Sequence, residues 1–369
     1  LWRLATSISR FGSALLSAAA LAFAMTSAQA EPLNPTPAES PRFPEVEIAA
    51  KFAPPGESNV RSSFKVAEGV AVMGTEETGD IYKTTDHGQT WTKIIDTDER
   101  WEISDVRNFI RAQDGAIYAT TSEPATILRS PDDGETWELL TKPKASRTVA
   151  LVQLDGGAIL AGLRRSENNK ISIIRSEDGF ASHDTVVLSD TLPRQNTTCL
   201  YDLGDGVVLC GVGFEASGKI FKSTDAGLTW KQTAEFDDAR DMMNFYEADG
   251  KVFAMCSGVS KLFVSDDAGE TWTTAAQVWE KGFLGQAATI ERDGKTFHLL
   301  AATDQRVKKQ PRHVVLISDD AGQTWFEWIE LAVDTSGGAS NLAVISEDTL
   351  VVGTGNHSVQ GYVYTLQFR

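Results

Sequence analysis

One octapeptide recurs along the chain at nearly constant intervals. Its five clear copies each hold an aspartate and end on a tryptophan: Asp86 with Trp91, Asp132 with Trp137, Asp225 with Trp230, Asp267 with Trp272, and Asp320 with Trp325. A sixth, degenerate copy spans 176–183 and keeps Asp178. The six aspartates lie 46, 46, 47, 42 and 53 residues apart. Such a period is typical of stacked, equivalent structural units.

The residues around each copy follow one order of short apolar runs. In the second unit the runs are 107–112, 116–120, 126–129 and 136–140, with Asp114-Gly115 between the first two. Asp-Gly between apolar runs is a strong hairpin signal, and it recurs at Asp155, Asp205, Asp249 and Asp293. Each unit is therefore predicted to be a four-stranded antiparallel meander. No helical period follows residue 30, so the fold class is all-β.

The octapeptide is expected to form the turn between the third and fourth strands. Its aspartate can accept hydrogen bonds from the backbone N–H groups of the turn, and its glycine supplies a conformation that other residues resist. Its tryptophan begins the outer strand. These roles are structural, so the repeat predicts the fold and leaves the function to the residues that vary between units.

Seven units are predicted, although only six carry the turn. Residues 340–368 supply three strands and lack an outer one, while the alternating segment 45–52 precedes the first complete unit. We expect this segment to close the ring by pairing with the last unit, which leaves only short, protected sheet edges. The prediction is a seven-bladed β-propeller of four-stranded antiparallel blades over residues 45–369, its last blade closed by an N-terminal strand. Residues 31–44 hold five prolines and are expected to be a leader too stiff and polar to pack.

The first thirty residues have the features of a secretory signal peptide. Arg3 and Arg10 precede an apolar run over 14–25, and Ala28-Gln29-Ala30 resembles a cleavage site. No later stretch is apolar enough for a membrane span. We expect an exported protein, periplasmic or secreted, of bacterial origin.

The charge of the chain is strongly acidic. The formal net charge is −17, and without Arg3 and Arg10 it becomes −19, from 32 basic and 51 acidic residues. Phosphate binding requires a basic surface, so nucleic acid is not an expected partner. The acidity is typical of a soluble surface.

The three cysteines are Cys199, Cys210 and Cys256. Cys199 and Cys210 lie on the two arms of a predicted hairpin, so a disulfide bond and a pair of buried free thiols both remain open. No Cys/His spacing resembles a zinc site. We expect neither a metal nor a cofactor.

The turn sequence resembles the Asp-box, or bacterial neuraminidase repeat, of the sialidase-like propeller superfamily. The resemblance runs from about residue 45 to residue 369 and implies the propeller fold. It does not imply one function, because Asp-boxes also occur in sortilin-type receptors, xyloglucan-cleaving hydrolases and the photosystem II assembly factor family. In these families the box lies away from the ligand face.

The chain departs from the sialidase pattern. Pro41-Arg42-Phe43-Pro44 has the composition of the Phe/Tyr-Arg-Ile-Pro segment in a different order, before the first full blade. The last three units have Met242, Gln286 and Asn341 where sialidase-like carboxylate binding would use arginine. The resemblance is therefore not to a typical sialidase.

A ligand site is expected where the inner strands begin, at the channel. Arg61, Arg107 and Arg147 stand at the starts of the inner strands of three consecutive units, seven or eight residues before the hairpin turns. Together the three guanidinium groups would bind a carboxylate, sulfate or phosphate. Alternatively, each arginine pairs with a neighbouring aspartate or carbonyl group. Gln286 and Asn341 are expected to complete this ligand-binding set.

The loops on the face of the propeller where the inner strands begin hold further candidate site residues. Trp101 is a candidate for stacking on a sugar ring, or for packing against its own loop. His357 and Tyr201 are the candidate proton-transfer groups, and His313 is a further histidine of these loops. The acidic segment 237–241 could supply glycosidase carboxylates, although such loops are commonly just solvated.

Three functions follow from these residues. The first is an exported propeller that binds an anionic, carbohydrate-like ligand through Arg61, Arg107 and Arg147. The second is a glycoside hydrolase or polysaccharide lyase that acts on an acidic glycan. The third is a non-catalytic scaffold or assembly factor that holds another exported protein.

Overall fold

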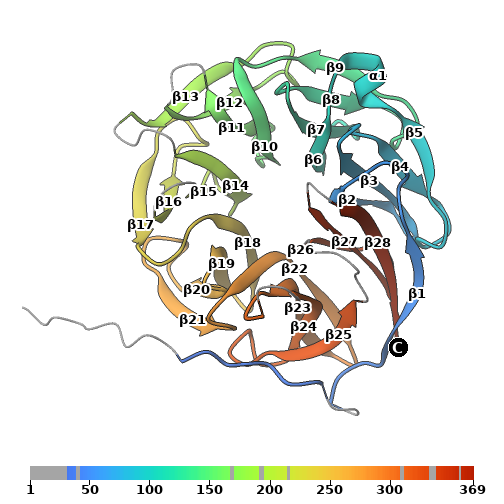
Figure 1. The fold of residues 1–369 in the computed structure, drawn as a ribbon. Helices are drawn as coiled ribbons and strands as arrows, with labels where there is room; N and C mark the ends of the chain where they lie inside the picture. Colours follow the sequence, from blue (N-terminus) through green and yellow to red (C-terminus); the bar gives the residue numbers. More distant parts are fainter. Residues whose placement is uncertain are drawn as a thin grey trace, which may run out of the picture. The chain divides into compact units, whose positions relative to one another are not determined.

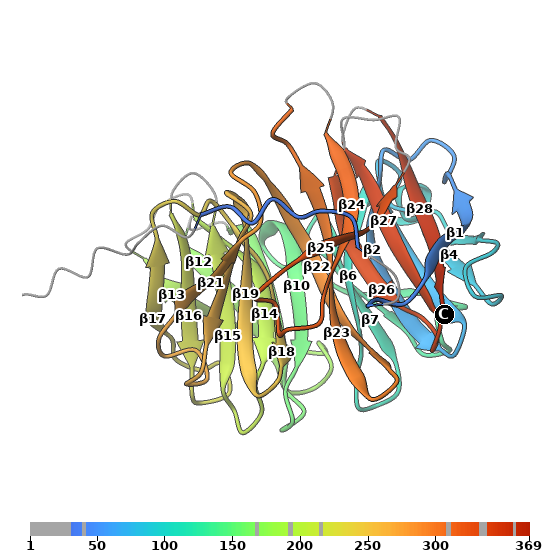
Figure 2. The ribbon, with the colours of Figure 1, turned by 90° about the horizontal axis from the view of Figure 1, so that it is seen from below.

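The computed structural model describes residues 31–38, 42–166, 170–190, 195–213, 217–307, 311–331, 338–356 and 359–369. Residues 31–369 form one compact unit. Its 28 strands make a ring of seven four-stranded antiparallel blades around a central channel (Figures 1 and 2). The predicted signal peptide, residues 1–30, lies outside the described residues.

The first four blades follow the chain in order. Blade 1 consists of β2 (Asn59–Ala67), β3 (Val70–Glu76), β4 (Ile81–Thr84) and β5 (Thr92–Ile95). Blade 2 consists of β6 (Asp105–Arg111), β7 (Ile117–Ser122), β8 (Ile127–Ser130) and β9 (Glu138–Thr141). Blade 3 consists of β10 (Ala145–Gln153), β11 (Ile159–Ser166), β12 (Ile171–Ser176) and β13 (Asp184–Ser189). Blade 4 consists of β14 (Asn196–Asp202), β15 (Val208–Gly213), β16 (Gly218–Ser223) and β17 (Lys231–Phe236).

The remaining blades complete the ring. Blade 5 consists of β18 (Met242–Ala248), β19 (Lys251–Gly258), β20 (Lys261–Ser265) and β21 (Thr273–Gln277). Blade 6 consists of β22 (Gly282–Arg292), β23 (Lys295–Asp304), β24 (Arg312–Ser318) and β25 (Phe326–Leu331). Blade 7 consists of β26 (Gly338–Val344), β27 (Thr349–Asn356), β28 (Val359–Phe368) and β1 (Val46–Phe52). One five-residue helix, α1 (Thr97–Trp101), lies between blades 1 and 2; sequence periodicity did not predict it.

The ring closes as predicted. Strand β1 pairs antiparallel with β28, from Val46 opposite Phe368 to Phe52 opposite Val363. The outer strand of blade 7 thus comes from the N-terminal side of blade 1. Because this pairing joins the two ends of the propeller, the last blade has its full four strands.

Each Asp-box is a turn held by one carboxylate. In blade 4, Asp225 Oδ1 accepts hydrogen bonds from Thr229 N and Ser223 Oγ, both at 2.8 Å, while Oδ2 accepts from Thr229 Oγ1 at 2.6 Å. The same three bonds recur at the other aspartates of the repeat, Asp86, Asp132, Asp178, Asp267 and Asp320. The hydrogen bonds from Thr271 are the main cause that lowers the pKa of Asp267 to about 2.

The turn requires two successive left-handed residues. Ala226 and Gly227 have φ angles of 58° and 82°. A Cβ atom on Gly227 would lie 2.4 Å from Leu160 of the preceding blade. Glycine is therefore needed here both for its backbone conformation and for the close approach of blade 3.

The box tryptophans pack between neighbouring blades. Trp137 is 3% exposed, lies 5.8 Å from Phe109 between ring centroids, and donates its Nε1 hydrogen to Gly134 O at 3.2 Å. The degenerate box of blade 3 lacks this tryptophan. Its Phe180, at φ 68°, is buried beside Tyr118 in the cluster between blades 2 and 3, so it fills the interblade space in the absent tryptophan's place.

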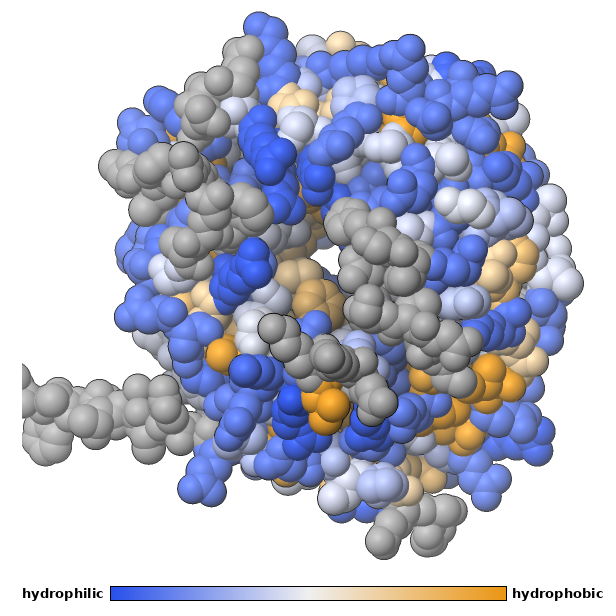
Figure 3. All heavy atoms as spheres, in the orientation of Figure 1, coloured by the Kyte–Doolittle hydropathy of each residue, from blue (hydrophilic) through white to orange (hydrophobic). Residues whose placement is uncertain are grey.

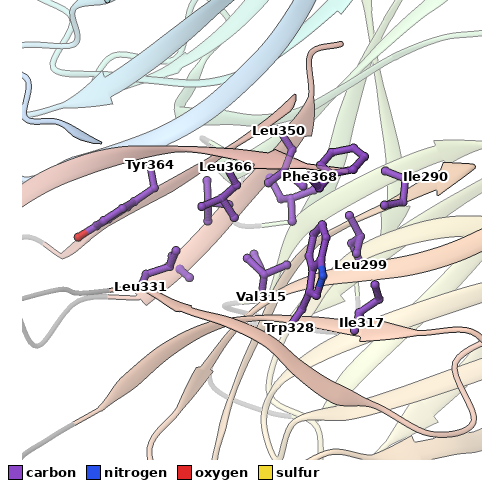
Figure 4. Packing of buried hydrophobic residues seen from close by; sticks show 14 of the residues in the cluster. Ile290, Leu299, Val315, Ile317, Trp328, Leu331, Leu350, Tyr364, Leu366 and Phe368 are labelled. Atoms are coloured by element: carbon purple, nitrogen blue, oxygen red, sulfur yellow. The ribbon is translucent and has the colours of Figure 1, made fainter. Parts of the chain in front are cut away.

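The largest hydrophobic cluster joins blades 6 and 7. Figure 4 shows Trp328 and Val315 of blade 6 facing Leu350 and Phe368 of blade 7. The centroids of the Trp328 and Phe368 rings lie 5.6 Å apart. This cluster covers the sheet that the β1 pairing completes, so packing and hydrogen bonding stabilise the closure together.

The prediction that the leader does not pack is wrong. Phe43 is 5% exposed within the same cluster, and Pro44 O accepts a hydrogen bond from Trp328 Nε1 at 2.8 Å. Figure 1 shows the N-terminal segment passing along blades 5 and 6 before it enters β1. Prolines restrict the backbone, but they leave carbonyl groups and apolar rings free to make contacts.

A buried carboxyl group lies at the joint between blades 7 and 1. Glu57 follows β1, and its backbone oxygen accepts hydrogen bonds from Gly361 N at 2.8 Å and Gln360 Nε2 at 3.0 Å. Burial raises the pKa of the Glu57 side chain to about 7, against the opposing effect of hydrogen bonds from Thr78. The nearby Asp80 carboxyl raises this pKa further.

We expect Trp137→Ala to lower the free energy of unfolding by about 3–5 kcal/mol, because it removes a buried aromatic ring and leaves a cavity between blades 1 and 2. Trp137→Phe keeps most of the ring and should cost clearly less. Chemical denaturation of both variants measures the difference. An unchanged midpoint for Trp137→Ala would contradict the packing role of the box tryptophan.

We expect Glu57 to make stability depend on pH. Its folded pKa of about 7 lies above the ordinary value of 4.5, so its contribution is fully present below about pH 4.5 and is lost as the pH rises through 7. The raised pKa corresponds to a loss on the order of 3 kcal/mol. Glu57→Gln should flatten this slope and be more stable than the wild type at pH 8; parallel melting curves for the two proteins from pH 5 to pH 8 would refute it.

Candidate ligand site in the central channel

Every inner strand has a β-bulge at the same point. The strand register shifts there in all seven blades, and the positions that face no residue of the neighbouring strand are Arg61, Arg107, Val149, Thr198, Met243, Gly285 with Gln286, and Ser340. All of them line one cavity of about 340 Å³. The ring has an opening at its centre (Figure 3). A bulge re-aims a side chain, so the seven bulges bring one residue or two from each blade to the channel.

Two of the three predicted arginines occupy this ring of bulges. Arg61 and Arg107 line the cavity from adjacent blades. The third prediction, Arg147, was placed in the wrong register: the bulge residue of blade 3 is Val149, and Arg147 lies two residues earlier. Arg164 of β11, which pairs with Arg147 across the sheet, lines the cavity instead. Counting back from the hairpin turn failed here because Asp114 lies seven residues after the bulge in blade 2, whereas Asp155 lies six residues after the bulge in blade 3.

Buried acids hold Arg61 and Arg107. Arg61 pairs with Glu76, and its Nε lies 3.9 Å from Asp105 Oδ1. Arg107 Nη2 lies 2.5 Å from Asp105 Oδ2, which also accepts a hydrogen bond from Ser122 Oγ at 2.9 Å. Asp105 therefore joins the two arginines of blades 1 and 2 in one network.

The network affects the acidity of its members. Burial lowers the pKa of Arg107 to about 10; Asp105 opposes this effect, whereas the positive charges of Arg61 and Arg147 add to it. Burial likewise raises the pKa of Asp105 against the pull of both arginines. Burial also lowers the pKa of Arg164, with a further contribution from Arg147. These mutual effects indicate that the guanidinium groups lie close enough to repel one another.

Arg147 makes a separate ion pair. Its Nη2 and Nε lie 2.6 and 3.2 Å from Glu123 Oε1. Glu123 directly follows Ser122, the last residue of β7. Ser122 pairs with Arg147 where blades 2 and 3 meet. Arg147 is not among the residues that line the cavity, and its charge is paired with Glu123.

The other side of the cavity holds side-chain amides and one carboxylate, Asp241. Asn244, Gln286 and Asn341 line it from blades 5, 6 and 7. Two of them also link blades: Gln286 Oε1 accepts a hydrogen bond from Leu342 N at 3.2 Å, and Asn341 Nδ2 donates to Val60 O at 2.7 Å. The predicted positions of Gln286 and Asn341 at the channel therefore agree with the structure, and both side chains have a second, structural role.

The remaining candidates do not meet at the cavity. Trp101 ends α1, packs half-buried against the blade 1–2 cluster, and has the Arg100 guanidinium 4.8 Å from its ring. Tyr201 lies near the hairpin end of β14, its hydroxyl 3.5 Å from Glu247 Oε2. His313 is buried beside Thr303. His357 lies outside the described residues.

The cysteines are free and buried. Cys199 lines the cavity and packs toward blade 5, whereas Cys210 packs toward blade 3. Their side chains thus point to opposite faces of one sheet and cannot form a disulfide bond. Burial raises the pKa of Cys199 to about 12.

In the part of the chain that the structure describes, no group of three or more His, Cys, Asp or Glu side chains could hold a metal ion. Within the same residues, no helix has both the length and the apolarity to cross a bilayer.

Comparisons with known proteins agree with this architecture. The model of the BNR/Asp-box repeat matches residues 263–274. No curated protein sequence matches the chain. Among solved structures, one described as YCF48 bound to D1 peptide has 17% identity and a TM-score of 0.62, and the match covers 90% of this chain and 98% of that one.

Two other solved structures have different activities. The GH74 xyloglucanase from Xanthomonas campestris has 16% identity and a TM-score of 0.62, with 85% of this chain and 52% of that chain covered. Streptogramin B lyase has 11% identity and a TM-score of 0.63, with 90% and 100% covered. At these identities the likeness extends to the fold alone. The chain is a seven-bladed β-propeller that carries the Asp-box, or BNR, repeat.

Proposed function

We propose that the protein binds an anionic, carbohydrate-like ligand in its central channel. The observation that carries this proposal is the division of the cavity into two sides. Arg61, Arg107 and Arg164 line one side, while the uncharged amides of blades 5, 6 and 7 line the other. A ligand with a carboxylate or sulfate at one end and hydroxyl groups at the other fits both.

Arg107 retains a donor for such a ligand. A guanidinium group has five N–H donors, and Arg107 directs Nε to Ser122 and Nη2 to Asp105. Its Nη1 makes no hydrogen bond with the residues that the structure describes. The acids behind the arginines keep the heads in place, so little conformational entropy is lost when an anion binds.

The amide side favours a ligand that donates hydrogen bonds. Asn341 is 2% exposed, and its Oδ1 has no hydrogen-bond partner among the described residues. The buried hydroxyl oxygen of the neighbouring Ser340 also has no hydrogen-bond partner among the described residues. An unpaired buried polar atom costs about 1–3 kcal/mol, so sugar hydroxyl groups that reach these atoms would add to the affinity.

Binding is better supported than catalysis. Hydrolysis of a glycosidic bond commonly uses two carboxyl groups that flank it, and Asp241 is the single carboxylate among the described residues that line the cavity. Of the two proton-transfer candidates for a lyase, Tyr201 lies near the other end of its strand. We therefore infer a ligand-binding propeller rather than a hydrolase or lyase; the appearance of ultraviolet-absorbing unsaturated uronate from an acidic glycan would reverse this choice.

A protein-binding function is the second candidate. It rests on the similarity to YCF48, a propeller whose solved complex holds a D1 peptide. The match extends over nearly the whole of that chain. A peptide that ends in a carboxylate would use the same arginines, so peptide and glycan ligands belong in one binding assay. Export to the periplasm or the medium remains part of the proposal.

We expect calorimetric titration with glucuronate, galacturonate, sialate and sulfated disaccharides to find at least one ligand whose affinity falls as salt rises. Arg107→Ala should weaken its binding about 10- to 100-fold, because it removes charge-assisted hydrogen bonds worth about 1.5–3 kcal/mol. Arg111→Ala is the matched control: it lies on the same strand and pairs with Asp133 near the opposite end.

The two variants separate the outcomes. Equal losses in Arg107→Ala and Arg111→Ala would point to general surface electrostatics. Unchanged affinity in Arg107→Ala, or no heat from any anion, would overturn the proposed site. The melting temperature of each variant shows whether a loss of binding reflects unfolding.

A further inference from the structure

The leader follows the outer edge of blades 5 and 6 and has a left-handed residue, Asn34 (φ 49°), near its start. Leu33 N donates to Gln277 O at 2.8 Å and Asn34 N donates to Val278 O at 3.0 Å, at the end of β21. Farther along, Ala38 N donates to Glu327 O and Glu327 N donates to Thr36 O, both at 2.8 Å. Pro37 and Glu327 form a parallel bridge. The leader therefore adds a short parallel strand to the edge of β25.

Side chains fix this strand at both ends. Arg306, which Asp304 holds at 2.7 Å, donates from Nη1 to Asn34 Oδ1 at 2.5 Å. At the other end, Arg42 Nε lies 3.0 Å from Asp319 Oδ2, and its guanidinium carbon lies 4.6 Å from the Phe326 ring centroid. Between these contacts Pro35 is buried. The groove thus recognises polar, apolar and backbone groups of the segment.

The prolines set the register of the segment. Residues 32, 35 and 37 are prolines, which have no N–H group, whereas the amides that donate to the propeller belong to residues 33, 34 and 38. If the prolines moved one position toward the C-terminus, they would fall on residues 33, 36 and 38 and remove two of the three donors. The sequence of the leader is therefore matched to the acceptors Gln277 O, Val278 O and Glu327 O.

The edge beneath the leader differs from an ordinary solvated strand. It presents Phe326 and Trp328, both part of the blade 6–7 cluster, and Trp279 next to Val278 is fully buried. An apolar sheet edge with unpaired backbone groups is a template for another strand. Adding a peptide strand to such an edge is an established mode of recognition.

We propose that the edge formed by Gln277, Val278 and Glu327 is a second binding site, which binds a peptide through backbone hydrogen bonds and accepts proline only at positions that donate none, and that residues 31–38 are its resident ligand. This site is separate from the channel: none of its residues lines the cavity of the arginines. It recognises peptide backbone through carbonyl acceptors and one amide donor. A segment with proline at position 33, 34 or 38 of this register is disfavoured because it lacks an N–H group that donates to the propeller.

The test uses the full chain, folded before it is cut. A specific protease sequence replaces residues 39–41, and cleavage then separates residues 31–38 from the propeller without removing Arg42 or β1. We expect the cut segment to stay bound in a 1:1 complex through native mass spectrometry, and a fluorescent peptide of residues 31–38 to exchange with it. A peptide of equal composition with prolines at positions 33, 36 and 38 should bind at least about tenfold more weakly, because it lacks two hydrogen bonds of about 1 kcal/mol each.

A second variant avoids cleavage. In the full chain, Leu33→Pro combined with Ala38→Pro should displace the leader and let the fluorescent peptide bind, whereas the wild-type chain with its groove filled should bind little. Loss of the cut segment without rebinding would overturn the proposal. Equal binding of the two peptides, or no binding to the double variant, would do the same.

Discussion

The pairing of β1 with β28 is the interaction on which the molecule depends. A blade of three strands would leave the edge of β28 unpaired and the blade 6–7 cluster open to water. The N-terminal strand fills that edge, so the first and last parts of the chain become one sheet. Closure also fixes the diameter of the channel, because every inner strand must then face the same axis. The geometry of the candidate site follows from this closure.

Because of its bulge, each inner strand has two roles. Regular pairing on either side of the bulge holds the blade together, while the extra residue turns toward the axis. Blades 1 and 2 place arginine there, blade 3 valine, and the later blades small, polar or flexible residues. Because no residue stands opposite a bulge residue in the strand register, the backbone pairing of the blade does not depend on its side chain. The channel can therefore acquire a specific chemistry in a repeat whose remaining positions are constrained by folding.

The charges of the channel illustrate a balance between stability and binding. Arg61 and Arg107 are held by the buried acids Glu76 and Asp105, which keeps two half-buried cations within an acidic protein. Removing one member of such a network leaves a buried charge without compensation, at a typical cost of about 3–5 kcal/mol. The same acids reduce the net positive charge that an anion meets. A ligand must therefore be recognised through the free N–H donors and the amide side as well as through charge.

The sequence by itself determined the all-β class, the seven units, the Asp-box turns and the closing strand, because these depend on local turn chemistry and on a period that repeats it. It also placed Arg61, Arg107, Gln286 and Asn341 at the channel, since the distance from each hairpin turn is nearly constant. Tertiary structure alone decided that Val149 stands in the bulge of blade 3 and that Arg164 replaces Arg147 at the cavity, because a shift of register changes which side chain faces the axis. Only the tertiary structure decided how the leader packs, because its hydrogen bonds join residues almost 300 positions apart. No local pattern in residues 31–44 indicates which backbone groups of the propeller accept these hydrogen bonds.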